Sequence, residues 1–243
     1  MNTITASRSS WLKTFLIMML TTVFLGGCAT VSEEYRDPRD PYESFNRAMY
    51  KFNDGLDKVV LKPLGKGYKA ITPAPVDRGI TNFFSNLNDV VSAVNNLLQF
   101  KLTRAASDVG RVLVNTTLGI LGFMDVASNM NLPKYGEDFG QTLGAWGINP
   151  GPYIVLPIFG PSSGRDAIGV VVDWYADPVL YLEPDHHRYW TRAIRAVDRR
   201  ADLLGASNVL EQAALDPYEF MRDAYLQKRE NDVYDGNPPL EDY

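Results

Sequence analysis

The chain has 243 residues, 45% of them apolar, and carries 24 Lys and Arg against 29 Asp and Glu, a net charge of −5. This acidic balance argues against an electrostatic footprint for nucleic acid or anionic lipid surfaces, so we expect no nucleic-acid partner. The length fits one domain with a sizeable core, and the apolar content favours a folded chain over a disordered one.

Residues 1–27 have the pattern of a secretory signal peptide. Arg8 and Lys13 form a basic start, and the apolar run 15–25 is shorter than the roughly 20 residues that a spanning helix needs. Leu-Gly-Gly-Cys then ends at Cys28, the only cysteine, and supplies the small residues that a lipoprotein signal peptidase requires. We therefore predict a lipoprotein signal peptide at 1–27 and lipid attachment at Cys28. The alternative is an ordinary secretory signal followed by a free thiol.

The segment 28–40 is polar, and we interpret it as an acylated tether. Two or three acyl chains on Cys28 would satisfy the need of a stable anchor for more than one chain. Ala29 stands where bacterial lipoproteins retained in the inner membrane usually carry Asp. Similarity to that sorting rule indicates a lipid-anchored protein of the outer membrane.

Asp40-Pro41-Tyr42-Glu43 predicts a helix start, with Asp40 as the N-cap, proline in the first turn and glutamate three residues after the cap. Apolar residues then recur at three- and four-residue spacing until Pro63, which we expect to end the helix. Such a stripe faces either a core or lipid, and we favour the core. It consists of Tyr42, Phe45, Met49, Phe52 and Leu56.

Further apolar stripes predict helices later in the chain. A glycine-punctuated segment, 118–130, separates two groups of them, and Asp177-Pro178 is expected to end one helix. The predicted helical segments are 80–98, 102–113, 138–146, 165–175 and 190–197.

Asp216-Pro217-Tyr218-Glu219 repeats the first helix start and predicts the last helix. From Glu230 the chain is acidic and contains Pro238-Pro239, so we predict a disordered tail over 230–243. Strand alternation of useful length is missing from the sequence. We therefore predict an all-α fold with one helical domain over 41–229.

The stretch 147–166 is apolar but cannot form a helix, because prolines at 150, 152, 157 and 161 interrupt it. The prolines stiffen its middle, and glycines give permissive backbone at both ends. These glycines are Gly144, Gly147, Gly151, Gly160 and Gly164.

The same stretch contains Gly160-Pro161-Ser162-Ser163-Gly164, which matches the G-x-S-x-G pattern of a hydrolase nucleophile elbow. Against this interpretation, Pro157 cannot donate the ladder hydrogen bond of the central strand that precedes such an elbow, and the chain lacks alternating strands and helices. We therefore predict that the protein is not an enzyme. The acid and histidine that a triad would use are Asp173 or Asp177 and His186 or His187.

Asp185-His186-His187 could in principle hold a metal. Neighbouring residues on a helix point in different directions, however, and an i, i+4 partner that would complete a ligand set is missing. The sequence also lacks a Gly-rich phosphate loop and a dinucleotide fingerprint. We expect no metal site and no cofactor.

Five segments carry a family resemblance: DPYESFNRAMYKFND (40–54), NTTLGILGFMDVA (115–127), FGQTLGAWG (139–147), GPYIVLPIFGPSSGRD (151–166) and DPYEFMRDAYLQKR (216–229). Together, and in this order, they resemble the MlaA/VacJ family of outer-membrane lipoproteins over residues 40–229.

The resemblance implies a ring-like helical lipoprotein in the periplasmic leaflet of the outer membrane, with an amphipathic channel through its middle. Members of this family take phospholipid mislocalised in the outer leaflet, pass it to a soluble periplasmic carrier (MlaC-like) and so maintain lipid asymmetry. Trimeric outer-membrane porins are their usual partners. The alternatives are a structural lipoprotein that scaffolds an outer-membrane complex, and a serine hydrolase acting on lipids.

The family has a hairpin-like loop beside the channel at the place of 147–166. We therefore predict that this segment is a lid that moves on its flanking glycines, from Gly144 to Gly164; the alternative is a static loop packed by its own side chains. Residues expected along the lipid path are Phe45, Asn46, Tyr153, Ile154, Leu156 and Phe159.

Overall fold

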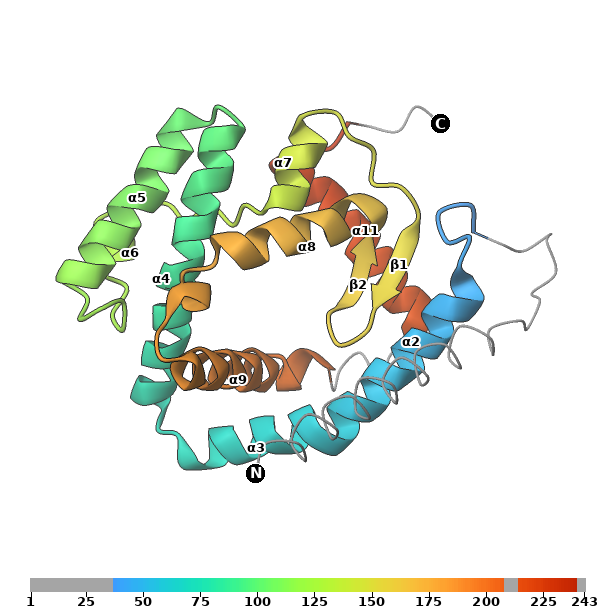
Figure 1. The fold of residues 1–243 in the computed structure, drawn as a ribbon, viewed down its shortest axis with the longest axis horizontal. Coiled ribbons are helices and arrows are strands. Elements are labelled where there is room, and N and C mark those ends of the chain that lie inside the picture. Colours follow the sequence, from blue (N-terminus) through green and yellow to red (C-terminus); the bar gives the residue numbers. More distant parts are fainter. Residues whose placement is uncertain (1–36, 208–213, 240–243) are drawn as a thin grey trace, which may run out of the picture.

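The computed structural model describes residues 37–207 and 214–239, and helices dominate it (Figure 1). The predicted helical domain is confirmed, with the addition of one short antiparallel hairpin. Within the described ranges, no helix has the length and apolarity to cross a bilayer. The predicted signal peptide and Cys28 lie outside these ranges.

The elements are α2 (Glu43–Leu56), η2 (Asp57–Leu61), α3 (Lys62–Ile71), α4 (Ala74–Leu98), α5 (Leu102–Thr117), α6 (Val126–Asn129), α7 (Phe139–Ala145), β1 (Tyr153–Leu156), β2 (Gly160–Ser163), α8 (Gly164–Ala176), η3 (Pro178–Tyr181), α9 (Asp185–Asp202) and α11 (Pro217–Val233).

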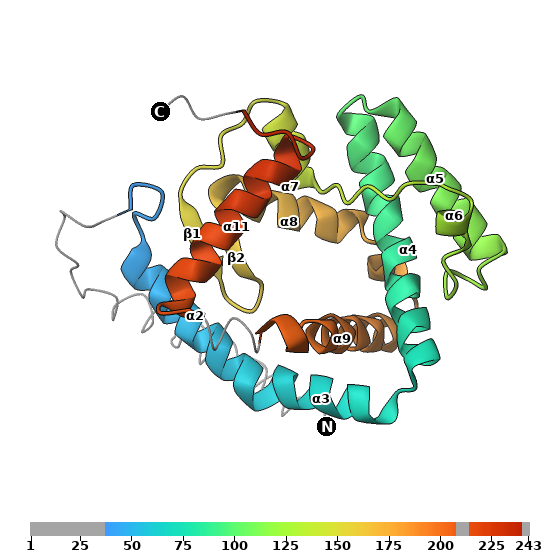
Figure 2. The ribbon, with the colours of Figure 1, turned by 180° about the vertical axis from the view of Figure 1, so that it is seen from behind.

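The elements are arranged around a ring (Figure 1). α2, η2 and α3 form one side, α4 rises from the end of α3, and α8 and the hairpin complete the circuit. α9 lies inside this circuit and packs along α3, while α5 packs on the outside of α4. Seen from behind, α11 crosses the hairpin between α7 and α2 (Figure 2). The ring that the resemblance implies is therefore present in this chain.

The first helix begins differently from the prediction. α2 starts at Glu43 without a side-chain cap, because the predicted cap residue, Asp40, turns inward. Asp40 is fully buried and accepts hydrogen bonds from the Asn46 amide, at 2.8 Å, and from the Tyr218 hydroxyl. Because its carboxylate bonds to Tyr218, far along the chain, Asp40 does not cap the helix.

The same helix also continues past Pro63. The single π-helical turn η2 joins α2 to α3, with the Lys62 amide donating to the Asp57 carbonyl, and Pro63 lies in the first turn of α3. A π turn rearranges the backbone hydrogen bonds locally, so the missing amide of proline is tolerated. The prediction that Pro63 ends the helix is wrong for this reason.

The predicted starts of α5, α7, α8 and α11 agree with the structure to within a residue, whereas α4 begins at Ala74 and α9 at Asp185, ahead of the predicted 80 and 190. Asp138 accepts the Gln141 amide at the start of α7, and Asp216 accepts the Tyr218 amide at the start of α11. At the far end, α11 passes the predicted tail boundary, Glu230, and continues to Val233. The carboxylate of Asp235 then lies 2.6 Å from Lys101 and 2.5 Å from Arg104, so the chain stays attached to α5 beyond that boundary.

Helices α4 and α5 bury polar side chains and expose apolar ones. Arg111 is 1% exposed, with Nε 3.0 Å from Asp89 and Nη2 3.1 Å from Asp125. Apart from Phe84 and Ala105, which are buried, the apolar stripes predicted for this pair therefore do not face the core. Amphipathic helices in water show the opposite arrangement, so this face is suited to apolar surroundings. Buried polar residues are Asn86, Asp89, Ser92, Asn95, Asn96, Ser107, Asp108, Arg111 and Asn115; exposed apolar residues are Val94, Leu97, Leu98, Leu102, Val109 and Leu113.

Candidate functional site

The predicted lid stretch contains the hairpin. β1 and β2 pair antiparallel, with Tyr153 opposite Ser163 and Leu156 opposite Gly160. The residues between the strands form an exposed apolar tip, in which Ile158 is 69% and Phe159 is 58% exposed. Two strands of four residues, with Pro157 between them and Pro161 in the second, give too little alternation to be recognised as a sheet, so the sequence pattern indicated a loop.

β1 is fixed to α2 by Asn46. Its amide nitrogen donates to the Tyr153 carbonyl at 3.0 Å, and its amide oxygen accepts the Val155 amide at 2.8 Å. The buried asparagine side chain thereby forms hydrogen bonds with a backbone carbonyl and a backbone amide on the outer edge of β1, as a third strand would. Asn46 was expected to line a lipid path, but it is fully buried and holds the hairpin instead.

Asn53 repeats the arrangement two turns along α2. It donates to the Leu156 carbonyl at 2.9 Å and accepts the Ile158 amide at 2.7 Å. Ile158 has φ of 71°, a region that a β-branched residue rarely adopts. Such strain persists only where neighbouring groups enforce it, and Asn53 supplies that restraint. The sequence analysis did not identify Asn53; its seven-residue spacing from Asn46 was the available signal.

The inner face of β1 packs against α2 and α11. Tyr153 and Val155 are fully buried in an apolar cluster with Met49 and Tyr218, and the Tyr153 ring lies 6.0 Å from that of Tyr225. Tyr153, predicted along the lipid path, therefore belongs to the core of the hairpin support.

The remaining predicted path residues differ in exposure. Phe45 packs against the same apolar cluster, and Ile154 and Leu156 are half-buried on the opposite face of β1. Phe159 at the tip is exposed, and its ring lies 6.4 Å from that of Trp174 on α8. The hairpin tip thus contacts α8 through these two aromatic side chains.

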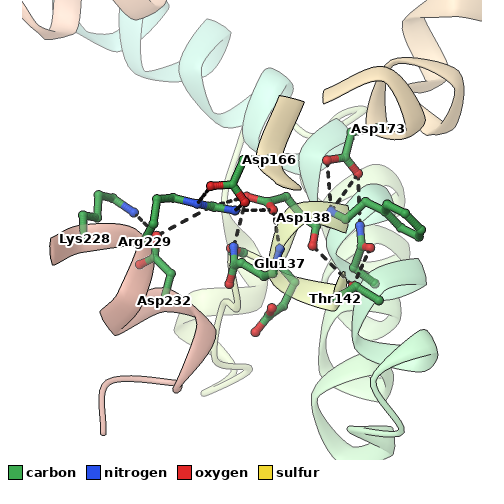
Figure 3. Close-up of polar contacts among 12 residues, drawn as sticks. Glu137, Asp138, Thr142, Asp166, Asp173, Lys228, Arg229 and Asp232 are labelled. Atoms are coloured by element: carbon green, nitrogen blue, oxygen red, sulfur yellow. Dashed lines mark hydrogen bonds and ion pairs between the residues drawn. The ribbon is translucent and has the colours of Figure 1, made fainter. Parts of the chain in front are cut away.

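An ionic cluster, which we name the clamp, joins three helices at the base of the hairpin; Asp166 is buried, and its other members are partly buried (Figure 3). It consists of Asp138, Asp166, Tyr225 and Arg229. Arg229 binds Asp138 through both terminal nitrogens, at 2.6 and 2.9 Å, and reaches Asp166 at 2.9 and 3.0 Å. The Tyr225 hydroxyl donates to Asp166 at 2.6 Å. Although burial opposes it, hydrogen bonding to Arg229 holds the pKa of both carboxyls below the ordinary 3.8.

Asp173 lies beside the clamp in Figure 3 and connects α8 to α7 and α4. Its carboxylate accepts the Phe139 amide at 3.0 Å and the Asn95 amide at 3.2 Å. Burial raises the pKa of Asp173 to about 6, and the neighbouring Asp138 adds to the rise. Asp173, a candidate triad acid in the sequence, thus uses its carboxylate to hold α8 against α7 and α4.

The predicted hinge glycines fall into two groups. Gly147, Gly151 and Gly160 have φ of 86°, 68° and 82°, a conformation that favours glycine. Gly144 lies within α7, where an added Cβ would come 2.8 Å from Arg165 and from Val233, so close packing requires glycine there. Gly164 begins α8 without positive φ.

Gly147 ends α7 with a Schellman motif. The Gly147 amide donates to the Gly144 carbonyl at 2.9 Å, and the Ile148 amide donates to Leu143 at 3.0 Å. Behind this turn, a cavity of about 880 Å³ lies between the loop 147–150 and α11. The turn therefore has a glycine with positive φ and open space beside it.

Comparison with known proteins decides the family. The model of the MlaA lipoprotein family matches residues 38–232, which is most of the chain. The chain belongs to the MlaA lipoprotein family. Its hairpin and clamp lie within the matched residues.

Individual MlaA proteins are similar over most of their length. The intermembrane phospholipid transport system lipoprotein MlaA of Haemophilus influenzae is 34% identical over 92% of both chains. The protein of the same name from Escherichia coli is 35% identical, over 88% of this chain and 86% of its own. A solved structure described as "Structural basis for maintenance of bacterial outer membrane lipid asymmetry" superposes with a TM-score of 0.70 at 34% identity, covering 82% of this chain and all of the other.

In this MlaA family member, the hydrolase-like residues do not form a nucleophile elbow. Ser162 lies within β2, is 2% exposed and donates to the neighbouring Ser163 carbonyl at 3.3 Å. Ser163 is instead the N-cap of α8. His186 and His187 lie at the exposed start of α9, with their rings against each other. An elbow needs its serine exposed on a turn between strand and helix, and Ser162 has neither property.

Ser162→Ala should leave function intact. Its loss would remove one weak hydrogen bond and lower the free energy of unfolding by at most about 1 kcal/mol, whereas loss of a nucleophile would abolish turnover. Outer-leaflet phospholipid, measured in a strain that carries only this variant, should equal that of wild type. Complete loss of function with an unchanged melting temperature would restore the hydrolase hypothesis.

Proposed function

We propose that this protein removes mislocalised phospholipid from the outer leaflet of the outer membrane through its ring and hands it to a soluble periplasmic carrier, so that lipid asymmetry is maintained. The observation that carries this proposal is the reversed burial of α4 and α5: polar side chains fill the space between these helices, and apolar side chains are exposed. A lipoprotein that only scaffolds a complex has no need for such a surface. Similarity to the two phospholipid transport lipoproteins supports the same function.

The exposed apolar surfaces support a position in the lipid. Val59 on η2, Ile71 on α3 and Phe100 after α4 are 77%, 83% and 85% exposed. Large apolar side chains exposed to this extent at several places on one molecule are suited to contact with lipid. An acylated Cys28 would hold the ring at the periplasmic leaflet.

The borders of the ring support a lipid path. The hairpin tip, α8 and α9 all carry exposed apolar or aromatic side chains, including Phe159, Val171, Tyr175 and Trp190. A lipid needs polar and apolar groups on the same path, and α9 combines these aromatic residues with arginines. We further propose a trimeric outer-membrane porin and an MlaC-like carrier as partners, which rests on the family.

The test is whether purified protein carries phospholipid and whether its loss exposes phospholipid on the cell surface. Lipid extracted from detergent-purified protein would be quantified by mass spectrometry, and outer-leaflet phospholipid by its susceptibility to an outer-membrane phospholipase. Co-bound phospholipid together with increased surface phospholipid in the deletion strain supports transport. A deletion strain with normal asymmetry, combined with lipid-free protein, supports the scaffold.

Cys28→Ser should weaken membrane retention. Each buried methylene of an acyl chain contributes about 0.8 kcal/mol, so loss of two or three chains outweighs ordinary peripheral contacts. The variant would be placed behind a cleavable non-lipoprotein signal, because an uncleaved signal could replace the anchor. Full co-sedimentation with outer membrane after a high-salt wash would contradict the prediction and assign retention to the ring alone.

A further inference from the structure

α9 carries a row of arginines that the hairpin and the clamp do not use. Arg188, Arg192, Arg195 and Arg199 follow one another at spacings of four, three and four residues, which places them on one face of the helix. This concentration of positive charge is unusual in a chain with a net charge of −5. α9 lies inside the ring (Figure 1), and its arginine row contacts α8 through Trp174 and the end of that helix through Asp177.

Two of these arginines are neutralised by carboxylates. Arg188 lies 2.8 Å from Asp185, and Arg195 lies 2.7 Å from Asp177. Arg192 and Arg199 make no ion pair with any carboxylate in the described ranges. The row therefore alternates between paired guanidinium groups and guanidinium groups without an acidic partner.

Arg192 is stacked on an aromatic platform. Its guanidinium carbon lies 3.7 Å from the centre of the Trp174 ring. Stacking occupies the face of the guanidinium and leaves its N–H donors in the plane, and Nη2 is buried without a hydrogen-bond partner. Buried hydrogen-bond donors almost always have an acceptor, and leaving a donor of a charged group without one costs free energy. We therefore expect a bound molecule to supply an acceptor to Arg192 Nη2.

Arg199 is two turns further along, about 10 Å in the axial direction. Its side chain is exposed, yet surrounding protein and the nearby Arg195 lower the pKa of its guanidinium. Arg199 lies on the same face of α9 as Arg192 and is exposed, so it offers a second cation on this face.

Apolar groups surround the platform. Phe159 of the hairpin tip contacts the Trp174 ring, and Val171 and Tyr175 are exposed on the same helix as Trp174. A ligand bound to Arg192 would therefore have an anionic group at the guanidinium and apolar groups beside it.

We infer that Arg192, stacked on Trp174, and Arg199 bind the phosphate of a phospholipid head group on its way through the ring. Phosphate oxygens match the planar donor fork of arginine, and the neighbouring tip and α8 supply contacts for the acyl chains. The inference rests on the proposed function, because it places its substrate on a defined wall of the ring. The tip lies on Trp174, so movement of the tip would change access to this site.

The test compares lipids with and without phosphate on purified, acylated full-length protein in a phosphate-free non-ionic detergent. Binding of labelled dioleoyl phosphatidylethanolamine and of dioleoylglycerol, which has the same chains and no phosphate, would be titrated for each variant. Arg192→Gln should weaken phosphatidylethanolamine binding about tenfold or more, the effect expected for hydrogen bonds to a charged group, and leave dioleoylglycerol binding unchanged. Arg192→Lys, which keeps the charge without the fork, should fall between them. Arg199→Gln should cause a smaller loss, and Arg78→Gln, an exposed arginine on α4, should match wild type.

The outcomes separate this inference from the proposed function. Equal phosphatidylethanolamine binding by wild type and by folded Arg192→Gln and Arg192→Lys overturns the phosphate site and leaves transport standing. Failure of wild type to bind either lipid overturns the proposed function itself. Displacement of phosphatidylethanolamine by equimolar inorganic phosphate would assign the site to free phosphate and overturn the lipid assignment.

Discussion

Arg229→Ala is expected to lower the free energy of unfolding by about 3–5 kcal/mol, the effect of removing one partner from a buried ion pair. The change would leave Asp138 and Asp166 facing each other without their shared cation, and Asp166 is 5% exposed. Because the clamp joins α7, α8 and α11, its loss should also loosen the base of the hairpin. Chemical denaturation followed by circular dichroism measures the effect.

Lys228→Ala is the matched control. Lys228 precedes Arg229 on the same helix, but its side chain is 72% exposed and, among the residues that the structure describes, it pairs only with Asp232, four residues away. Exposed pairs of this kind contribute less than about 1 kcal/mol. Equal stability of the two variants would mean that the clamp contributes no more than a surface pair.

The clamp also predicts acid sensitivity. Asp138 and Asp166 have folded pKa values below their ordinary 3.8, so their contribution to stability is complete above that value and is lost as the pH falls through the folded pKa values. Wild type should therefore lose stability steeply below pH 4. Arg229→Ala should lose less over the same range, because Arg229 makes the main contribution to the lowered pKa values of both carboxyls.

Local signals in the sequence predicted helices well where the capping residue had no other partner. The motif Asp-Pro-Tyr-Glu occurs twice, and only the second copy caps its helix through Asp216. Asp40 in the first copy bonds instead to Tyr218, which belongs to the second copy. Two motifs that look independent in the sequence are thus in contact, and only the tertiary structure determines which aspartate caps.

The same explanation applies to Arg47. Its guanidinium lies 2.6 Å from Glu43, 2.7 Å from Asp216 and 2.9 Å from Glu219, so acids of both motifs converge on it. Sequence spacing could suggest the pair with Glu43, four residues away, and gave no sign of the other two. The contacts that fix the ring are of this long-range kind.

Periodicity identified apolar faces but not their surroundings. The stripes on α4 and α5 have helical spacing, yet Leu102 and Leu113 are exposed, and Asp108 and Arg111 are buried between the helices. An amphipathic pattern is the same whether its apolar face meets a protein core or lipid. Only the burial of charged groups, which requires partners from both helices, distinguishes the two cases.

Among the predicted hinge glycines, Gly147 is well suited to a test by substitution, because an added Cβ would meet no neighbour. Gly144, its predicted companion, is unsuitable, because a larger residue there would collide with Arg165 and Val233 and disturb packing. At Gly147 nothing lies within 4 Å of an added Cβ, so any effect of substitution comes from the backbone. Its φ of 86° is the property to remove.

Gly147→Val should impair lipid passage while the protein is still made, acylated and folded. A β-branched residue at this φ is strained by about 1–3 kcal/mol, which is enough to shift the loop 147–152 strongly toward another conformation and to change the position of the hairpin. Gly147→Asn, which tolerates positive φ, should keep asymmetry close to wild type, as should Ala145→Val at an exposed helical position. Surface phospholipid would be measured by phospholipase susceptibility, alongside protein level and melting temperature. If Gly147→Val folds normally and asymmetry stays intact, the stretch is a static loop and the lid hypothesis is wrong.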